Sequence, residues 1–178
     1  MDKKVLLIDL DQCVRCFACE IACKQENDLP VGPRWMQIAT IEPRKVQDTL
    51  HLDFVPLPCL HCDDPPCAHF CPTGAIKKRD DGIVLIEKES CDHCQLCMDG
   101  CPYGRIFRDE ETGTVGKCNL CVDRIDFGLQ PTCVQHCIGG ALQLVTEKES
   151  RDITEGQHSV RMGAVCYTST KWKLNAGA

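Results

Sequence analysis

The sequence has few aromatic residues, and its apolar residues form no long run. Aromatic residues make up 5% of the 178 residues, so an ordinary hydrophobic core would be thin. No apolar stretch approaches the roughly 20 residues of a membrane-spanning helix. Asp9 interrupts the run Val5–Ile8 before it reaches the length of a signal-peptide core. We therefore expect no membrane contact, no secretion, and a cytoplasmic protein.

Positive charge and catalytic patterns are also scarce. Lys and Arg number 20 against 26 Asp and Glu, which gives a formal net charge of −6. A nucleic-acid or anionic-membrane partner would require a basic face, so neither is expected. No nucleophile–base pattern, Gly-rich phosphate loop or flavin motif is present. We expect a chain that is not catalytic by itself and that docks on a positively charged partner protein.

Cysteine, by contrast, is abundant. Of 17 cysteines, 16 form four motifs that each open with C-x2-C and close with C-x3-C. Motif I is Cys13/Cys16/Cys19/Cys23, motif II Cys59/Cys62/Cys67/Cys71, motif III Cys91/Cys94/Cys97/Cys101, and motif IV Cys118/Cys121/Cys133/Cys137. Motif III, followed by Pro102, has the spacing of bacterial ferredoxins, in which three thiolates bind one cluster and the fourth binds its neighbour. Four motifs predict four [4Fe–4S] clusters and electron transfer.

Other interpretations of the cysteines remain. Zinc sites use two pairs separated by a longer loop, and only motif IV, with its 11-residue gap, fits a zinc knuckle. Motif IV also has Ile138 where Pro72 and Pro102 follow motifs II and III. A disulfide module is the third interpretation, because cysteine is so frequent. Cys166, outside the motifs, is expected to be a buried packing residue.

Four histidines adjoin the motifs: His61, His69, His93 and His136. Every motif already has four thiolates, so we expect these histidines to be surface residues, or hydrogen-bond donors to a cluster sulfur that tune its potential. The basic turn Lys77–Arg79 is expected to be a solvated hairpin tip.

An internal repeat divides the chain into two modules. In the middle, a strand after Cys71, an Asp-Gly turn and the strand 83–86 predict a hairpin between motifs II and III. The same parts recur at the ends, where residues 5–13 match 83–91 and residues 137–142 match 71–76. The repeat is complete only if the strand 141–145 pairs with the strand 5–8. We expect an α+β fold of two ferredoxin-like modules, small and loop-rich, with short β-hairpins.

The repeat also predicts a crossed ligation, because the fourth cysteine of one motif binds the cluster of the partner motif. The predicted ligand groups are group 1, Cys13, Cys16, Cys19 and Cys137; group 2, Cys118, Cys121, Cys133 and Cys23; group 3, Cys59, Cys62, Cys67 and Cys101; and group 4, Cys91, Cys94, Cys97 and Cys71.

The domain boundaries follow from this repeat. Residues 1–145 form the double ferredoxin-like domain, with module A from 1–33 plus 102–145 and module B from 59–101. Residues 34–58 are an inserted hairpin, with strand patterns in 35–41 and 50–55. The gap of motif IV has helical spacing from Val122, and Gly128 suits its stop. Residues 146–178 are expected to be an extended docking tail with an apolar part at 165–167 and Trp172.

Six stretches carry a resemblance to a known family: 8–13 (IDLDQC), 22–30 (ACKQENDLP), 61–67 (HCDDPPC), 71–76 (CPTGAI), 101–104 (CPYG) and 117–121 (KCNLC). They closely resemble the four-cluster iron–sulfur subunits of the dimethyl-sulfoxide-reductase type, over residues 3–145. The resemblance implies a subunit that relays electrons between a large molybdenum or tungsten pterin subunit and a redox partner. It also implies the crossed ligation.

A finer resemblance concerns residues 33–36 and 158–174, which look like the small subunits of cytoplasmic tungsten aldehyde oxidoreductases and related benzoyl-CoA reductase complexes. It implies a tungstopterin subunit that oxidises aldehydes to acids, and a flavin/NAD subunit or a ferredoxin as second partner. The alternatives are a subunit of a molybdenum dimethyl-sulfoxide-reductase-type enzyme and a free polyferredoxin carrier. A terminal cluster near the surface would also allow identical chains to abut, so self-association is a further expectation.

Overall fold

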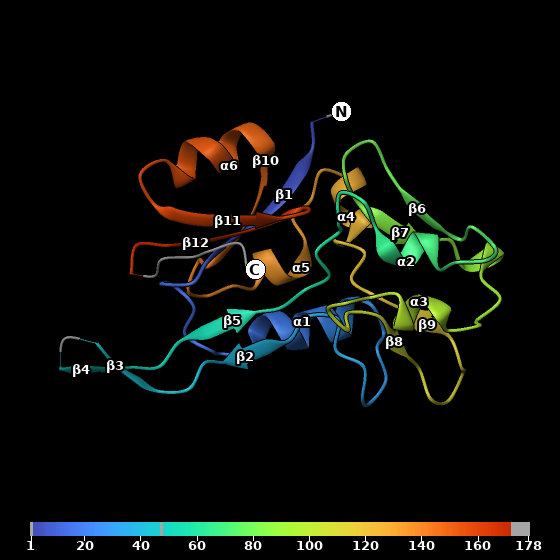
Figure 1. Cartoon of the computed structure of the whole chain (residues 1–178), viewed down its shortest axis with the longest axis horizontal. Helices are drawn as coiled ribbons and strands as arrows, with labels where there is room; N and C mark the ends of the chain where they lie inside the picture. Colours follow the sequence, from blue (N-terminus) through green and yellow to red (C-terminus); the bar gives the residue numbers. More distant parts are fainter. Residues whose placement is uncertain (1, 47, 172–178) are drawn as a thin grey trace.

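The computed structural model describes residues 2–46 and 48–171. Its largest sheet has four strands in the order β10–β1–β12–β11. Their bounds are β1 Lys4–Asp9, β10 Leu142–Thr146, β11 His158–Met162 and β12 Val165–Ser169. β1 is antiparallel to β10 and parallel to β12, and β11 is antiparallel to β12. The sheet and the helix α6 (Glu147–Thr154) lie at one end of the molecule (Figure 1). At the opposite end lie the hairpin of β6 (Ile76–Lys78) and β7 (Val84–Ile86) and the helices α2 (Pro66–His69) and α3 (Leu96–Asp99).

β1 is one of the two inner strands of this sheet and is buried on both faces. Val5, Leu6, Leu7 and Ile8 are all at most 1% exposed. Val5 and Leu7 pack with Cys166 on the face that carries α6, whereas Leu6 and Ile8 pack into the main core with Cys19, Cys23 and Cys133. A strand with two buried faces requires a continuous apolar run rather than an alternating one, and this is why residues 5–8 are uniformly apolar.

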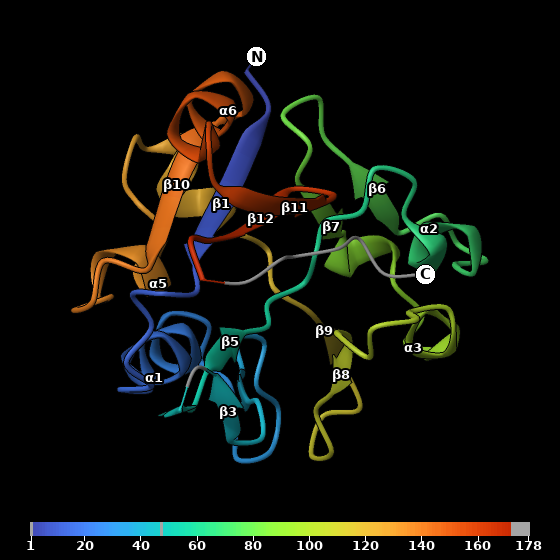
Figure 2. The ribbon, with the colours of Figure 1, turned by 60° about the vertical axis from the view of Figure 1, so that its left-hand side comes forward.

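The predicted pairing of the chain ends is confirmed. β1 and β10 are antiparallel neighbours, with Lys4 opposite Thr146 and Ile8 opposite Leu142. The two strands lie side by side in Figure 2. The central half of the repeat is confirmed as well, because β6 (Ile76–Lys78) and β7 (Val84–Ile86) form a hairpin in which Ile76 faces Ile86.

The expectation of an extended tail is wrong for residues 146–171. Thr146 caps α6 in a reciprocal capping box with Glu149, and such a box is a strong local signal for a helix start. The chain then forms β11, turns at Gly163 and returns as β12, which is buried throughout. This segment therefore completes the central sheet. Trp172, part of the predicted tail, lies outside the described residues.

The inserted hairpin has the predicted form, with shifted bounds. β2 (Ile38–Thr40) pairs with β5 (Phe54–Pro56), and β3 (Arg44–Val46) pairs with β4 (Thr49–His51) near the tip. In the gap of motif IV, α4 (Val122–Asp126) begins where the spacing predicts and ends before Gly128. A single 3-10 turn, η1 (Lys88–Ser90), leads from β7 into motif III.

One hairpin was not predicted. β8 (Phe107–Arg108) and β9 (Val115–Gly116) are only two residues long each. Ile106 and Val115, which flank or begin these strands, pack in a small core with Cys67 and Cys97. The repeat assigned residues 102–116 to module A. Ile106 and Val115 nevertheless pack against cysteines of motifs II and III, which belong to module B. Among residues 2–46 and 48–171, no helix is long and apolar enough to cross a bilayer.

Candidate metal centres

Each cysteine motif begins with the same backbone turn. The second residue after the first cysteine has a left-handed conformation in all four motifs: Arg15 (φ 54°), His61 (46°), His93 (59°) and Leu120 (55°). This conformation costs a residue with a side chain roughly 1–2 kcal/mol. In motifs II and IV, the N–H of that residue donates to the first cysteine's Sγ, at 3.5 Å for His61 and 3.4 Å for Leu120. The turn therefore supplies a backbone donor to a sulfur atom, which stabilises negative charge there.

The third cysteine of every motif is the second residue of a helix. These helices are α1 (Ala18–Glu26), α2 (Pro66–His69), α3 (Leu96–Asp99) and α5 (Thr132–Gln135). Motifs I and III enter the helix through a left-handed residue, Phe17 or Gln95, whereas motifs II and IV enter it through Pro65 or Pro131. Motif I thus corresponds to motif III, and motif II to motif IV, as the repeat predicts.

The chain leaves three motifs through one shared turn. Gly74, Gly104 and Gly140 have φ between 58° and 66° and donate to the carbonyls of Cys71, Cys101 and Cys137 at 3.0–3.3 Å. Positive φ is a conformation that glycine adopts at little cost. Motif IV makes this turn with Ile138 after its last cysteine, so the missing proline does not alter it. Motif I differs, because α1 continues past Cys23 to Glu26.

Three cavities are each lined by four cysteines, and every one of them combines two motifs. One cavity is lined by Cys13, Cys16, Cys19 and Cys137, a second by Cys59, Cys62, Cys67 and Cys101, and a third by Cys71, Cys91, Cys94 and Cys97. These are the members of groups 1, 3 and 4. Four thiols around one cavity are the donor set that a [4Fe–4S] cluster requires.

Group 2 lies in the main core. Burial raises the pKa of Cys133 well above its usual value, and the neighbouring thiols of Cys118, Cys121 and Cys23 raise it further. Burial is likewise the main cause that raises the pKa of Cys23 to about 12, and the neighbouring thiol of Cys121 raises it further. The thiols of Cys118, Cys121 and Cys23 are thus neighbours of the Cys133 thiol. The four thiols of motif IV itself are split between groups 1 and 2, whereas a zinc knuckle would need all four at one ion.

The four groups form a row. Cys133 of group 2 is affected electrostatically by Cys19 of group 1, and Cys118 of group 2 by Cys59 of group 3. Cys97 of group 4 is in turn affected by Cys67 of group 3. The order along the row is therefore group 1, group 2, group 3, group 4.

The ends of this row are nearer to solvent than its middle. Cys16 in group 1 and Cys94 in group 4 are exposed, and all four thiols of group 2 are buried. Large apolar side chains are exposed near group 1, namely Val14 (61%), Ile21 (55%) and Ile138 (79%). Near group 4, Leu96 is 45% exposed. Both ends of the row thus reach surfaces on which a partner could dock.

Burial holds several of the motif thiols neutral. Burial is the main cause that raises the pKa of Cys19 to about 12, and of Cys67 and Cys97 to about 11. Bound metal deprotonates a thiol outright. Among residues 2–46 and 48–171, no three His, Cys, Asp or Glu side chains are placed to hold a single metal ion. In groups 1, 3 and 4 the four thiols instead surround a shared cavity.

The histidines next to the motifs are not equivalent. His69 pairs with Asp64 at 2.6 Å on the surface, and His136 Nδ1 lies 2.9 Å from the carbonyl oxygen of Thr132. His93 Nδ1 lies 3.9 Å from Cys91 Sγ, a contact of the kind expected for a donor to sulfur. His61 differs from all of these, because it is only 1% exposed.

Two side chains from the cysteine loops bind the open edge of β7. The Val84 N–H donates to His61 Nδ1 at 3.0 Å, and the Val84 carbonyl accepts from Lys117 Nζ. Lys117, only 3% exposed, also donates to the carbonyl of Cys118 at 3.2 Å. Burial, and after it the charge of Lys117, holds the pKa of His61 well below its usual value. This role of Lys117 was not predicted, and its place directly before Cys118 was the only signal of it.

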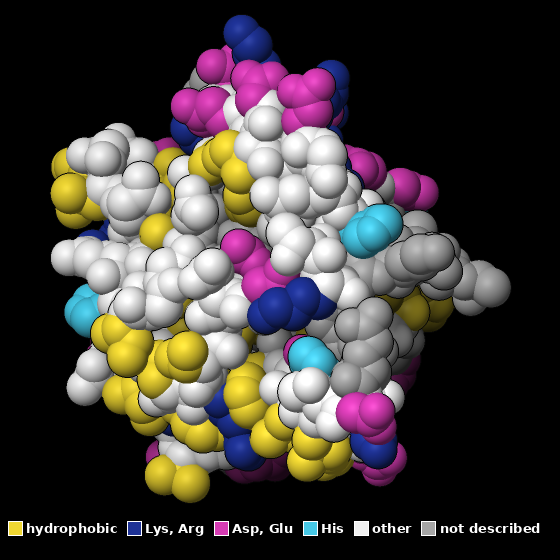
Figure 3. All heavy atoms as spheres, turned by 90° about the vertical axis from the view of Figure 1, so that its left-hand side faces the viewer, with side chains coloured by type: hydrophobic (Ala, Val, Ile, Leu, Met, Phe, Trp, Pro, Cys, Tyr) yellow, Lys and Arg dark blue, Asp and Glu magenta, His cyan; other side chains and the backbone are white. Residues whose placement is uncertain are grey.

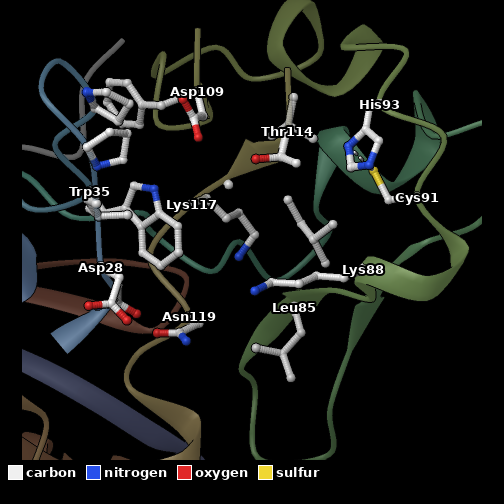
Figure 4. A pocket seen from close by; sticks show the side chains of 18 of the residues that line it. Asp28, Trp35, Leu85, Lys88, Cys91, His93, Asp109, Thr114, Lys117 and Asn119 are labelled. Atoms are coloured by element: carbon white, nitrogen blue, oxygen red, sulfur yellow. Dashed lines mark hydrogen bonds between the residues drawn. The ribbon is translucent and has the colours of Figure 1, made fainter. Parts of the chain in front are cut away.

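A cavity of about 600 Å³ lies beside groups 2 and 4. Figure 4 shows Lys88 and Lys117 extending into it, with Trp35 on the opposite wall and Asp28 and Asn119 nearby. Its lining combines both signs of charge with an indole ring. Unlike the three smaller cavities, it is lined by only one of the motif cysteines, Cys91.

Comparison with known proteins agrees with this geometry. A family model described as "4Fe-4S dicluster domain" matches residues 50–147. The thiosulfate reductase electron transfer subunit PhsB of Salmonella typhi is 38% identical over 148 residues, which cover 82% of this chain and 77% of that protein. A tetrathionate reductase subunit of Salmonella typhimurium is 39% identical over 141 residues, which cover 76% of this chain and 55% of that protein. A sulfite dehydrogenase subunit of Allochromatium vinosum is 36% identical over 163 residues, with 79% and 68% covered.

The chain therefore spans only about half of one of these relatives and roughly two thirds to three quarters of the others. The family match contains motifs II, III and IV, and the alignments extend over most of the chain. On this similarity, and on the four groups of thiols, the chain belongs to the 4Fe-4S dicluster domain family.

Proposed function

We propose that this chain is an iron–sulfur subunit that relays electrons through four [4Fe–4S] clusters, held by groups 1 to 4. The observation that carries the proposal is the row of four-thiol groups, whose outer members reach the surface. A cluster of this kind supplies one-electron redox chemistry at a potential that its surroundings set. The chain would contribute the sixteen thiolates, the backbone N–H donors to sulfur, and a buried core that excludes water from group 2.

The proposed partners are a large catalytic subunit with a molybdenum or tungsten pterin and a second redox protein. The names of the relatives support this, since they are subunits of reductases and a dehydrogenase. Exposed apolar side chains support a docked subunit rather than a free carrier. Besides those near group 1, Leu50 (71% exposed), Leu52 (45%) and Ile41 (39%) lie on the inserted hairpin. Figure 3, which looks onto the left-hand side of Figure 1, shows hydrophobic side chains gathered on the lower part of that face and a group of acidic ones at its top.

The specific reaction is the finer part of the proposal. The resemblance of residues 33–36 and 158–174 favours a tungsten enzyme that oxidises aldehydes, with a flavin/NAD subunit or a ferredoxin as electron acceptor. The names of the relatives favour an enzyme that acts on a sulfur compound, and the resemblance to the dimethyl-sulfoxide-reductase type implies a molybdenum enzyme. We propose a cytoplasmic complex in either case, and we retain both enzymes as candidates for the catalytic partner.

Purification of the native complex under anaerobic conditions tests the function. We expect about sixteen iron and sixteen sulfide per chain, together with a large subunit that carries tungsten or molybdenum. Metal analysis and assays with an aldehyde, tetrathionate and thiosulfate then distinguish the two candidate enzymes. Zinc in place of iron, or a chain without metal, would refute the relay.

The same preparation tests two further expectations. Size measurement over a range of concentrations tests self-association, because a single defined complex at all concentrations contradicts it. Removal of the clusters by oxidation and chelation should unfold most of the chain, since ligand bonds replace much of its apolar core. Circular dichroism before and after chelation measures this.

A further inference from the structure

His61 is a buried histidine, and one of its ring nitrogens has no partner among the described residues. Its Nδ1 accepts a hydrogen bond from the Val84 N–H at 3.0 Å. A neutral imidazole that accepts at Nδ1 carries its proton on Nε2. That Nε2–H group is fully buried and makes no hydrogen bond to residues 2–46 or 48–171. A buried donor without a partner costs about 1–3 kcal/mol, so its presence points to an acceptor that these protein atoms do not supply.

The position of His61 indicates this acceptor. His61 lines the cavity of group 3 together with its four cysteines, and Lys117 and Val84 line the same cavity. Lys117 directly precedes Cys118 of group 2, and its charge acts on Cys62 and Cys67 of group 3. His61 and Lys117 therefore lie between the two inner groups of the row.

The inner groups face a physical problem that the outer groups do not. Each cluster becomes more negative when it is reduced, and burial away from water disfavours that added charge. Group 2 is the most deeply buried of the four. Without compensation, the clusters in the middle of the row would be the hardest to reduce, and they would interrupt electron flow between the ends.

We propose that His61 Nε2–H and Lys117 Nζ act as buried donors toward the clusters of groups 2 and 3 and raise their reduction potentials. The inference rests on the proposed function. A hydrogen bond to a cluster sulfur, or a fixed positive charge beside the cluster, stabilises the reduced state relative to the oxidised state. The two side chains also bind the N–H and the carbonyl of Val84 in β7. Each therefore has a structural role as well as the proposed redox role, and experiment must separate the two.

Matched variants separate these roles. His61→Leu removes both ring nitrogens, whereas His61→Gln keeps an acceptor for Val84 and a donor amide. Lys117→Met removes the charge and keeps the length of the side chain, whereas Lys117→Arg keeps the charge. Two controls change exposed side chains instead: His69→Leu, whose ring is 65% exposed, and Lys77→Met, whose side chain is 62% exposed and whose ammonium pairs with Glu87 at 2.7 Å.

The measurement is a redox titration of the anaerobic holoprotein, followed by electron paramagnetic resonance. We expect His61→Leu and Lys117→Met each to shift at least one cluster to a lower potential. His61→Gln, Lys117→Arg and both controls should leave the potentials close to those of the wild type. Unchanged potentials in both His61→Leu and Lys117→Met, at full iron content, would overturn the inference and leave the relay intact. A wild-type protein without four clusters would instead refute the proposed function before any variant is compared.

A second measurement covers the case in which the variants lose a cluster. Wild-type protein labelled with ¹⁵N in histidine should show a nitrogen hyperfine coupling to a reduced cluster. The coupling from His61 should disappear in His61→Gln, whose amide carries no label. The same spectrum from both proteins would show that His61 makes no contact with a cluster and would overturn its part of the inference.

Discussion

The contact between the C-terminal hairpin and motif II gives the sharpest test of the fold. Gly163, in the turn between β11 and β12, has φ +60° and lies against the backbone of the cysteine loop 60–62. A Cβ at this position would overlap with the carbonyl oxygen of Leu60 and lie 2.7 Å from that of His61. The next residue, Ala164, donates its N–H to Leu60 at 2.8 Å. Replacement of Gly163 by Ala should therefore push the hairpin away from motif II.

The magnitude follows by comparison with Gly156, which has φ +78° but no described atom within 4 Å of its would-be Cβ. Gly156→Ala should cost only the left-handed conformation, roughly 1–2 kcal/mol. Gly163→Ala adds the overlap, for which crowding typically costs about 1–3 kcal/mol. At about 2–4 °C per kcal/mol for a protein of this size, we expect Tm to fall by about 2–8 °C and about 4–20 °C respectively.

The assay is thermal unfolding of the anaerobic holoprotein, followed by circular dichroism and by the loss of cluster absorbance. Because the loop 60–62 carries Cys62 of group 3, Gly163→Ala should also speed the loss of iron, whereas Gly156→Ala should not. Equal Tm shifts for the two variants would refute the contact, and with it the placement of the C-terminal hairpin on motif II.

Three further predictions address single elements. Cys23→Ser should lower the iron content by about four atoms per chain, which is one cluster. Cys166 packs with Val5 and Leu7 under α6, so Cys166→Ser should keep the full iron and sulfide content. Loss of iron in Cys166→Ser would contradict the packing role of Cys166. The backbone N–H and the hydroxyl of Thr146 donate to the Glu149 carboxylate and lower its pKa. The carboxylate therefore stabilises α6 at any pH above its unfolded pKa of about 4.3. This stabilisation is lost as the pH falls through the lower pKa of the folded protein. Amide hydrogen exchange in α6 should thus be faster in Glu149→Ala than in the wild type at pH 7. The difference should hold down to about pH 4.3 and narrow only as the pH falls further; a difference that persists unchanged well below pH 4 would count against the capping box. Arg79 binds Asp126 of α4 through two hydrogen bonds at 2.7 and 2.8 Å. Asp126→Asn should lower the Tm slightly, because the pair is exposed to solvent, and 1 M salt should reduce this effect; a Tm independent of both changes would show that the pair contributes nothing.

The grouping of the thiols could be predicted because it depends on repetition. Residues 5–13 match 83–91 and residues 137–142 match 71–76, and the two matches together predicted that β1 lies beside β10 and Cys137 beside Cys13. The local geometry of the motifs was within reach for the same reason, since Gly74 and Gly140 occupy equivalent positions with the same φ. Iron ligation by these groups stays a prediction that the metal analysis must test.

Other features could not be predicted, because they have no counterpart in the repeat. β12 pairs in parallel with β1, more than 150 residues away, and no local pattern specifies such a distant neighbour. The capping box at Thr146 and the turn at Gly163 are different, because they were readable signals of a helix and a hairpin and were nevertheless missed. His61 is buried where its Nδ1 accepts the Val84 N–H, and only the assembled fold shows that these two residues meet.

The role of the C-terminal segment follows from the difference between the two halves of the repeat. In the middle of the chain, β6 and β7 are joined by a short turn, so their pairing costs little loop entropy. β1 and β10 form the equivalent pair at the chain ends, with more than 130 residues between them, and their association must be stabilised by additional burial. β12 and α6 provide it, since β12 completes the hydrogen bonding of β1 and Cys166 and Val145 pack with Val5 and Leu7 on the face beneath α6. The segment expected to be a tail is thus what allows Cys137 to meet Cys13, Cys16 and Cys19 in group 1.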